Sequence, residues 1–283
     1  MTIEAISRLT TDEYAWVREL STGLAAEDQI EHFPRFVVRS PYRDEPALPL
    51  ARTRYASLYA VSYDPGSDGP DLQAYDDDAI WVVLAGEATF RTKGDREVGR
   101  IGQYHGLLTP QGVPYRYENT GDGLLVMLRG AGRGEPMEAY RDFYTGTGEG
   151  GTEAISWRRD PWPGVEGDGG PFKRFNLRFP LRGENVSAWR VLARTDHIAM
   201  HSSSLEPGKG EVNLHCHDDE AIWVVLYGQV TYFGEEENRE LCTLRAHDGI
   251  VIPQDQLYRY VNTADGYLHM LRFAGRKEAP APL

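Results

Sequence analysis

The chain contains two histidines separated by a single residue, His215 and His217. This spacing is the clearest candidate in the sequence for a metal-binding site. On a β-strand, residues two positions apart point to the same face, so a strand here would place both imidazoles side by side. Two neutral imidazoles in that arrangement can bind one iron, zinc, copper or nickel ion and leave coordination positions open for water or a substrate. The alternative is that both histidines only form hydrogen bonds in a polar interior. Cys216 would point to the opposite face, and we interpret it as a packing residue.

The histidines are concentrated in the C-terminal part of the chain, which favours that part as the site of any metal chemistry. Six of the eight lie there: His197, His201, His215, His217, His247 and His269.

The chain contains the same unit twice. The segment 76–86 returns as 218–228, and the segment 110–119 returns as 253–262. Repeats of about a hundred residues are whole domains rather than turns of a solenoid. In the shared frame His215 and His217 stand opposite Gln73 and Tyr75, so only the second unit carries the histidine pair. The repeat predicts an N-terminal extension at 1–32, a first unit at 33–135, a linker at 136–171 and a second unit at 172–283.

Charge and composition narrow the class of partner. The formal net charge of -13 repels nucleic-acid phosphate and anionic lipid, so it argues against nucleic-acid and membrane-surface roles. No apolar run approaches the roughly 18 residues of a membrane span, and the N-terminus lacks the features of a signal peptide. We therefore expect a cytoplasmic protein with a small-molecule substrate, and assembly as a homodimer stays open.

The local sequence pattern predicts an all-β fold with a helical extension. Short runs rich in Val, Tyr, Thr and Leu are separated by turn sequences such as 64–66 and 206–208, which is typical of antiparallel strands in a sandwich or barrel. We expect strands, not helices, at 80–84 and 222–226. The charged, periodic segment 1–32 predicts a short helix that packs on the first unit, and 135–144 a second one.

The two repeated blocks resemble the two sequence motifs of the cupin superfamily, and the whole chain is similar to a bicupin. In that family the first motif contains a glycine, a His-x-His pair, a glutamate and a strand ending in glycine. The second contains a proline, a histidine and an asparagine. The resemblance implies two tandem jelly-roll barrels, with a metal in the second. The matching residues are Gly210, His215, His217 and Gly228 in the first motif and Pro253 and Asn262 in the second.

The resemblance leaves the third metal ligand open. The position of the family's glutamate is Ala221, and Glu220 lies one residue earlier, where it would face outward unless the strand is bulged. The family's second histidine is replaced by Tyr258, whose phenolate could bind a cation or whose ring could simply pack. We take Tyr258 and Glu220 as candidate ligands and as candidate groups for moving a proton. The first unit has no conventional ligand at the equivalent positions, which are Gln73, Tyr75, Ala79 and Tyr115.

Three further side chains are candidates for binding a substrate. His201 has the strand parity of a residue that points into the second barrel, and His269 replaces Val126 of the first unit on the last strand. Trp223 recurs as Trp81, which favours core packing, with substrate stacking as the alternative.

These observations together predict a metal-dependent bicupin enzyme that acts on a small polar or aromatic molecule at the second barrel. By resemblance, the expected reaction is oxygenation with Fe(II), while Zn, Ni, Cu or Mn are alternative metals. Fold alone does not determine chemistry, so two other classes stay open. One is a non-oxidative isomerase, cyclase or lyase with a zinc-type Lewis acid. The other is a non-catalytic small-molecule binding protein.

Overall fold

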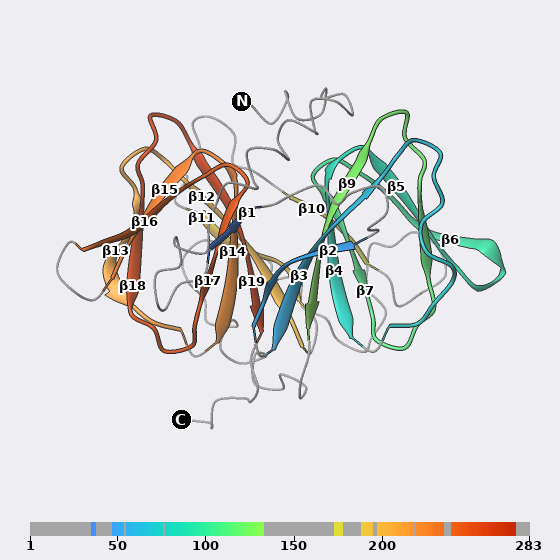
Figure 1. The fold of residues 1–283 in the computed structure, drawn as a ribbon, viewed down its shortest axis with the longest axis horizontal. Coiled ribbons are helices and arrows are strands. Elements are labelled where there is room, and N and C mark those ends of the chain that lie inside the picture. The colour runs from blue at the N-terminus through green and yellow to red at the C-terminus, as the bar shows by residue number, and fades with distance from the viewer. Residues whose placement is uncertain are drawn as a thin grey trace.

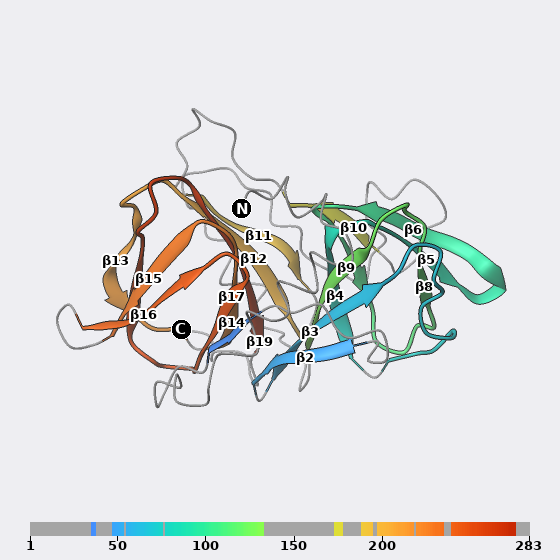
Figure 2. The same cartoon turned by 45° about the horizontal axis from the view of Figure 1, so that its top comes forward.

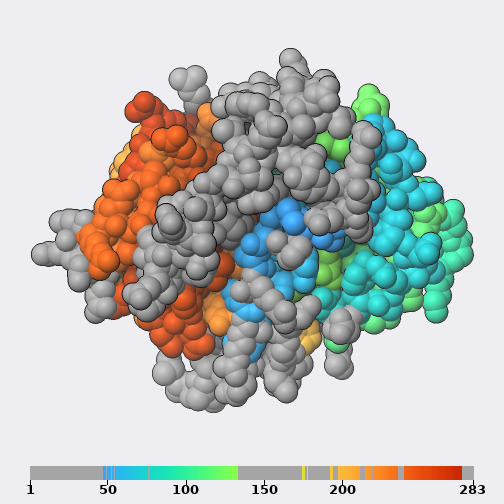
Figure 3. Space-filling view, in the orientation of Figure 1, coloured from blue at the N-terminus to red at the C-terminus, as the bar shows by residue number. Residues whose placement is uncertain are grey.

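The computed structural model consists of two β-structured units that lie side by side (Figure 1). In the space-filling view the first unit forms one end of the molecule and the second unit the other (Figure 3). The predicted helices at 1–32 and 135–144 and the predicted linker lie outside the described residues. Within the described part of the chain no helix could span a lipid bilayer. The structure describes residues 35–37, 47–53, 55–75, 77–132, 173–177, 188–194, 197–217, 219–234 and 239–275.

Antiparallel strands form both units, as the sequence predicts. The first repeat supplies β1 (Arg35–Val37), β2 (Ala47–Arg52), β3 (Ala56–Tyr63), β4 (Asp78–Ala85), β5 (Glu87–Thr92), β6 (Arg96–Gly102), β7 (His105–Thr109), β8 (Arg116–Asn119) and β9 (Leu125–Gly132), with a 3₁₀ turn η2 (Lys93–Asp95) between β5 and β6. The second supplies β10 (Lys173–Asn176), β11 (Ala188–Arg194), β12 (Ala199–Leu205), β13 (Gly210–His215), β14 (Glu220–Tyr227), β15 (Gln229–Phe233), β16 (Glu240–Arg245), β17 (Asp248–Ile252), β18 (Tyr258–Asn262) and β19 (Leu268–Gly275).

Each unit has a larger and a smaller sheet that enclose a hydrophobic interior (Figure 2). We call the two pairs of sheets barrel 1 and barrel 2. In the described part of barrel 1 the strand orders are β10-β7-β4-β9-β3-β2 and β6-β5-β8. In barrel 2 they are β1-β17-β14-β19-β12-β11 and β13-β18-β15-β16. The apolar runs predicted to be strands lie in β4 and β14, so that prediction is confirmed.

The strands between the barrels are buried on both faces, which explains why their sequences are apolar almost without interruption. In β14, Trp223 and Val225 point into barrel 2, whereas Ile222 and Val224 belong to a separate core. That core also contains Ile80, Val82 and Leu84 of β4, so it is a hydrophobic layer shared by the two barrels. Adjacent residues on these strands therefore serve different cores, because successive side chains alternate between the two faces.

The first strand of each repeat pairs with the other repeat. Strand β1 runs antiparallel to β17 of the second repeat, and β10 runs antiparallel to β7 of the first. Phe175 of β10 lies against Gly106, where a Cβ would come within 2.0 Å of the ring, so only glycine fits there. The boundaries at 33 and 172 mark where the repeated sequence begins, and strand pairing crosses them.

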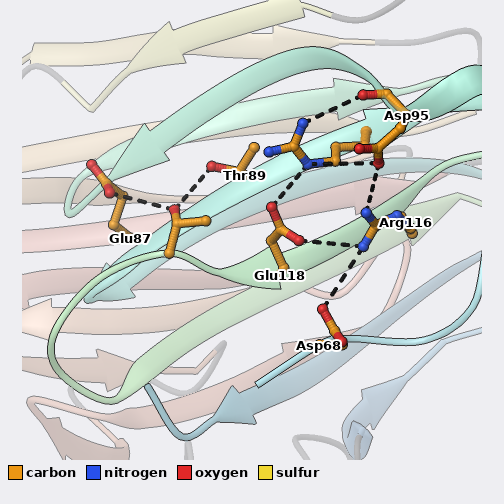
Figure 4. A network of polar contacts seen from close by, with 8 residues as sticks. Asp68, Glu87, Thr89, Asp95, Arg116 and Glu118 are labelled. Atoms are coloured by element: carbon orange, nitrogen blue, oxygen red, sulfur yellow. Dashed lines mark hydrogen bonds and ion pairs between the residues drawn. The ribbon is translucent and has the colours of Figure 1, made fainter. Parts of the chain in front are cut away.

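The outer face of the small sheet in barrel 1 carries a network of ion pairs (Figure 4). The sequence predicts that the recurring Arg116 and Arg259, each next to a tyrosine, face away from it and form structural ion pairs. The Arg116 guanidinium lies 2.6 Å from the Asp95 carboxylate and 3.3 Å from that of Glu118, which confirms the prediction for Arg116. The equivalent Arg259 lies over the ring of Phe233, 4.2 Å from its centre.

The close packing of the shared layer predicts that a larger side chain there lowers the stability of the protein. A Cβ at Gly130 would lie 2.3 Å from the buried ring of Phe273, across the layer between the barrels. Gly130→Ala should therefore lower the free energy of unfolding by about 1–3 kcal/mol, the usual cost of overpacking. Gly123→Ala is the matched control, because a Cβ at Gly123 meets nothing within 4 Å. Urea denaturation of both variants measures the difference, and an equal free energy of unfolding would contradict the tight packing described here.

Candidate metal centre in the second barrel

His215, His217 and Tyr258 lie together in barrel 2. His215 is the last residue of β13, and its backbone pairs with Tyr258 at the start of β18. The centres of the two imidazole rings are 5.1 Å apart, and the Tyr258 ring centre is 4.6 Å from that of His215 and 6.0 Å from that of His217. The Tyr258 hydroxyl and His215 Nε2 are buried atoms. Strand pairing thus brings the phenol to the histidine pair from a distant part of the sequence.

The spacing of the two imidazoles fits a shared metal ion. A coordinating nitrogen about 2.1 Å from the ion places the ring centre about 3.2 Å from it. Two rings at an angle of about 90–110° at the ion then have centres about 4.5–5.2 Å apart. The observed 5.1 Å falls within this range. The donor set, two nitrogens and a phenol oxygen, suits iron, zinc or copper.

Among the described residues, no three His, Cys, Asp or Glu side chains are grouped so that they could hold a metal ion. The Tyr258 ring is the side chain with an oxygen donor that the ring distances place beside the two histidines. Cys216, between the histidines, is exposed, so it does not pack in the core as the sequence suggested.

Glu220 lies on the opposite face of β14 from the histidine site. Ala221 and Trp223 of this strand belong to the core of barrel 2. Glu220 lies on the same face of the strand as Ile222, which belongs to the layer between the barrels. Its carboxylate accepts a hydrogen bond of 3.3 Å from the backbone N–H of Tyr55 in the first repeat. The one-residue offset from the family position thus places this carboxylate at the contact between the repeats.

The three candidate substrate-binding residues are divided between the two faces of the large sheet. His201 is fully buried, and its Nδ1 lies 3.4 Å from Nη1 of Arg272. Trp223 is buried in the core of barrel 2. His269 is on the other face, where its Nδ1 lies 2.8 Å from the Ser204 hydroxyl. The structure therefore brings His201 and Trp223, but not His269, into the interior of barrel 2.

A buried ion pair in each barrel was missed by the sequence analysis. Arg272 pairs with Asp219 in barrel 2, and Arg129 pairs with Asp77 in barrel 1. The sequence did contain a sign of these pairs, because the aspartate and the arginine each recur at the same position in both repeats. The Arg272 guanidinium also lies 5.8 Å from the centre of the Trp223 ring. Because each arginine is paired with a carboxylate, the pair adds no net charge to the interior.

In barrel 1, the residues at the positions of the barrel 2 site form hydrogen bonds within the barrel. Gln73 Nε2 donates to the Tyr75 hydroxyl, so the residues that replace the histidine pair bind each other. The Tyr115 hydroxyl is hydrogen-bonded to Trp81 and Thr109. Burial raises the pKa of Tyr115 to about 12, which keeps its phenol protonated at neutral pH. These residues are poor candidates for holding a metal.

Comparison with known proteins finds similarity at the level of the fold. No family model matches the chain, and no curated protein sequence matches it. Protein YlbA from E. coli superposes with a TM-score of 0.60 at 14% identity, covering 94% of this chain and 99% of its own. A cupin 2 conserved barrel domain protein from Leptotrichia buccalis gives a TM-score of 0.57 at 12% identity, covering 88% and 99%. A mutant of Bacillus subtilis oxalate decarboxylase gives 0.56 at 16% identity, covering 88% and 78%.

The position of His269 predicts a pH dependence of stability. Burial lowers the pKa of His269 to about 4, below its ordinary 6.5. Because the unfolded chain takes up this proton at a higher pH than the folded chain, the stability that the neutral ring confers is complete above about pH 6.5 and is lost as the pH falls towards 4. His269→Val, which introduces the residue found at Val126, should flatten this part of the curve. Urea denaturation across this range tests it, and the same pH slope in both proteins would contradict the assignment.

Proposed function

The chain has a two-domain cupin fold, and from this premise we propose that barrel 2 is a metal centre held by His215, His217 and Tyr258. We propose further that the protein is a metal-dependent oxygenase acting on a small polar or aromatic molecule. Fe(II) is the favoured ion, with Zn, Ni, Cu or Mn as alternatives. The observation that carries the proposal is the contact of two imidazoles and a phenol in barrel 2, at positions where barrel 1 has Gln73, Tyr75 and Tyr115.

The residues of barrel 2 have distinct roles in this proposal. His215 and His217 hold the ion, and a bound Fe(II) supplies redox chemistry towards dioxygen. Tyr258, buried beside His215, is the third donor or the group that moves a proton. The Trp223 ring and the buried core around it exclude water, which strengthens electrostatic interactions at the site. His201, beside the Arg272–Asp219 pair, offers a polar contact to a bound molecule.

A non-oxidative reaction is the second candidate, and the phenol of Tyr258 favours it. A phenol placed beside a Lewis acid can transfer a proton in an isomerisation, cyclisation or lyase reaction. The similarity to oxalate decarboxylase is in keeping with a reaction other than oxygenation. Because Glu220 lies at the contact between the repeats, Tyr258 is the group that we assign to proton transfer. A non-catalytic binding protein is the third candidate.

Metal analysis followed by an oxygen-consumption screen separates these three. Iron together with oxygen uptake supports the oxygenase, and zinc without uptake supports the non-oxidative enzyme. A protein that binds neither metal supports the third candidate.

Replacing both histidines tests the location of the metal. His215→Ala combined with His217→Ala should abolish metal binding and leave the fold intact, because both side chains are only partly buried and contribute little to the core. Gln73→Ala combined with Tyr75→Ala in barrel 1 should leave the metal content unchanged. Elemental analysis and circular dichroism of the purified proteins give the two readouts. Loss of metal from the barrel 1 variant alone would reverse our assignment of the two barrels.

Tyr258→Phe tests the role of the phenol, because it keeps the ring and removes only the oxygen. If the phenol is a ligand or moves a proton, activity should fall by roughly a hundredfold or more, while the melting temperature of the metal-free protein changes little. Tyr115→Phe is the matched control in barrel 1. It should lower the melting temperature instead, because it removes hydrogen bonds to Trp81 and Thr109. Unchanged metal affinity and activity in Tyr258→Phe would exclude both roles of the phenol.

A further inference from the structure

The two small sheets lie at opposite ends of the molecule, and their outer faces can be compared position by position (Figure 1). Thr89 pairs with Glu118 in barrel 1, and Thr231 pairs with Val261 in barrel 2, so the glutamate and the valine are equivalent. The same strand registers align three further pairs of positions, which are Asp68 with Gly210, Glu87 with Gln229 and Arg91 with Phe233.

The two outer faces differ in charge. In barrel 1 the Glu118 carboxylate forms ion pairs with Arg91 and Arg116 (Figure 4). Barrel 2 has an uncharged residue at all three of the aligned acidic positions and a phenylalanine at the position of Arg91. Arg259 lies over that phenylalanine ring. The acidic Glu240 lies on β16, at the other edge of this sheet from β13. The side of the face next to β13 is therefore less negative than its counterpart in barrel 1.

The edge of the sheet differs between the barrels as well. In barrel 2 residues 210–215 form the strand β13, which stands at the edge of its sheet and pairs with β18. In barrel 1 the equivalent residues 68–73 form no strand and meet the small sheet at two isolated bridges. A strand at the edge of a sheet presents a row of backbone N–H and C=O groups with which another strand can pair.

Two leucines at equivalent positions have large exposed apolar side chains, Leu72 at 41% and Leu214 at 39%. The residues that follow them, Gln73 and His215, pair with equivalent tyrosines, which establishes the equivalence. Because successive side chains on a strand alternate and His215 points inward, Leu214 lies on the outer face together with Arg259. The edge of barrel 2 thus combines a regular strand with an exposed apolar side chain.

We propose that this edge of barrel 2, formed by β13 with Leu214, Phe233 and Val261, binds a second copy of the chain. The two β13 strands would run antiparallel about a two-fold axis. Charge favours this occupant, because two copies with a net charge of -13 repel each other, and this edge lacks three acidic residues that barrel 1 carries. An edge strand is also complementary to its own copy across a two-fold axis, since antiparallel pairing makes the backbone donors and acceptors of the two strands face each other.

This inference is independent of the proposed function. It uses the backbone edge of β13 and the outer face of the sheet, whereas the two histidines and Tyr258 belong to the inner face. A monomeric protein would leave the metal centre untouched, and a protein without metal would leave the dimer untouched.

Leu214→Asp tests the interface, with Leu72→Asp as the matched control at the equivalent exposed position. Sedimentation velocity over a series of protein concentrations should show the wild type as a dimer. In Leu214→Asp the dissociation constant of the dimer should rise about tenfold or more, because the two-fold axis places two new carboxylates in the contact. Leu72→Asp should dimerise as the wild type does. A wild type that is monomeric at about 1 mM, or equal effects of the two changes, would overturn the inference.

Val261→Glu is a second variant that introduces the residue found at Glu118. It should weaken the dimer in the same direction, and circular dichroism of all variants checks that the fold is retained. Unchanged dimerisation in both Leu214→Asp and Val261→Glu would overturn the inference.

Hydrogen exchange locates the contact. In the dimer the outward-pointing backbone N–H groups of residues 210–215 should exchange about tenfold or more slowly than in the monomer, because they take part in hydrogen bonds between the copies. The N–H groups of residues 68–73 should exchange equally in both states. A dimer that protects another segment and leaves β13 unchanged would overturn the inference.

Discussion

The strands between the barrels must fill two hydrophobic cores at once, and the other features of the molecule depend on this constraint. Each of these strands gives one face to its own barrel and the other to the shared layer, in which Phe273 of the second repeat packs against Gly130 of the first. Since the faces alternate with every residue, a shift of one position moves a side chain from the site to the layer. Glu220 and His269 lie on the layer side of this division, whereas Trp223 and His201 lie on the barrel side.

The two barrels share a framework but differ in how their interiors satisfy polar groups. The buried Arg–Asp pair and the aromatic residues on the facing strands are common to both. In barrel 1 Gln73 is hydrogen-bonded to Tyr75, and Tyr115 is hydrogen-bonded to Trp81 and Thr109. In barrel 2 imidazoles take the places of Gln73 and Tyr75, and Ile252 takes the place of Thr109. The two copies thus share a framework and differ at the positions of the histidine pair and of Ile252.

Much of this architecture could be predicted from the sequence because it rests on local patterns. The doubled blocks and the alternation of apolar residues identify the strands, and the His-x-His spacing places two imidazoles on one face. The sequence does not predict that β1 pairs with the second repeat and β10 with the first. Because these two strands have similar sequences, each could equally pair within its own repeat. The face occupied by Glu220 depended on whether β14 was bulged near its start, which only the pairing of that strand reveals. The Arg272–Asp219 pair joins residues 53 positions apart in the sequence. That the two residues meet, and that both are buried, is known only from the structure.

We propose that barrel 2, and not barrel 1, holds a metal ion between His215 and His217. An anomalous-difference map from crystals of the full chain grown with cobalt(II), recorded at the cobalt absorption edge, locates such an ion. We expect a peak within coordination distance of both imidazoles, about 2.1 Å from each nitrogen, and no peak inside barrel 1. A peak between Gln73 and Tyr75, or none at the histidine pair, would contradict it.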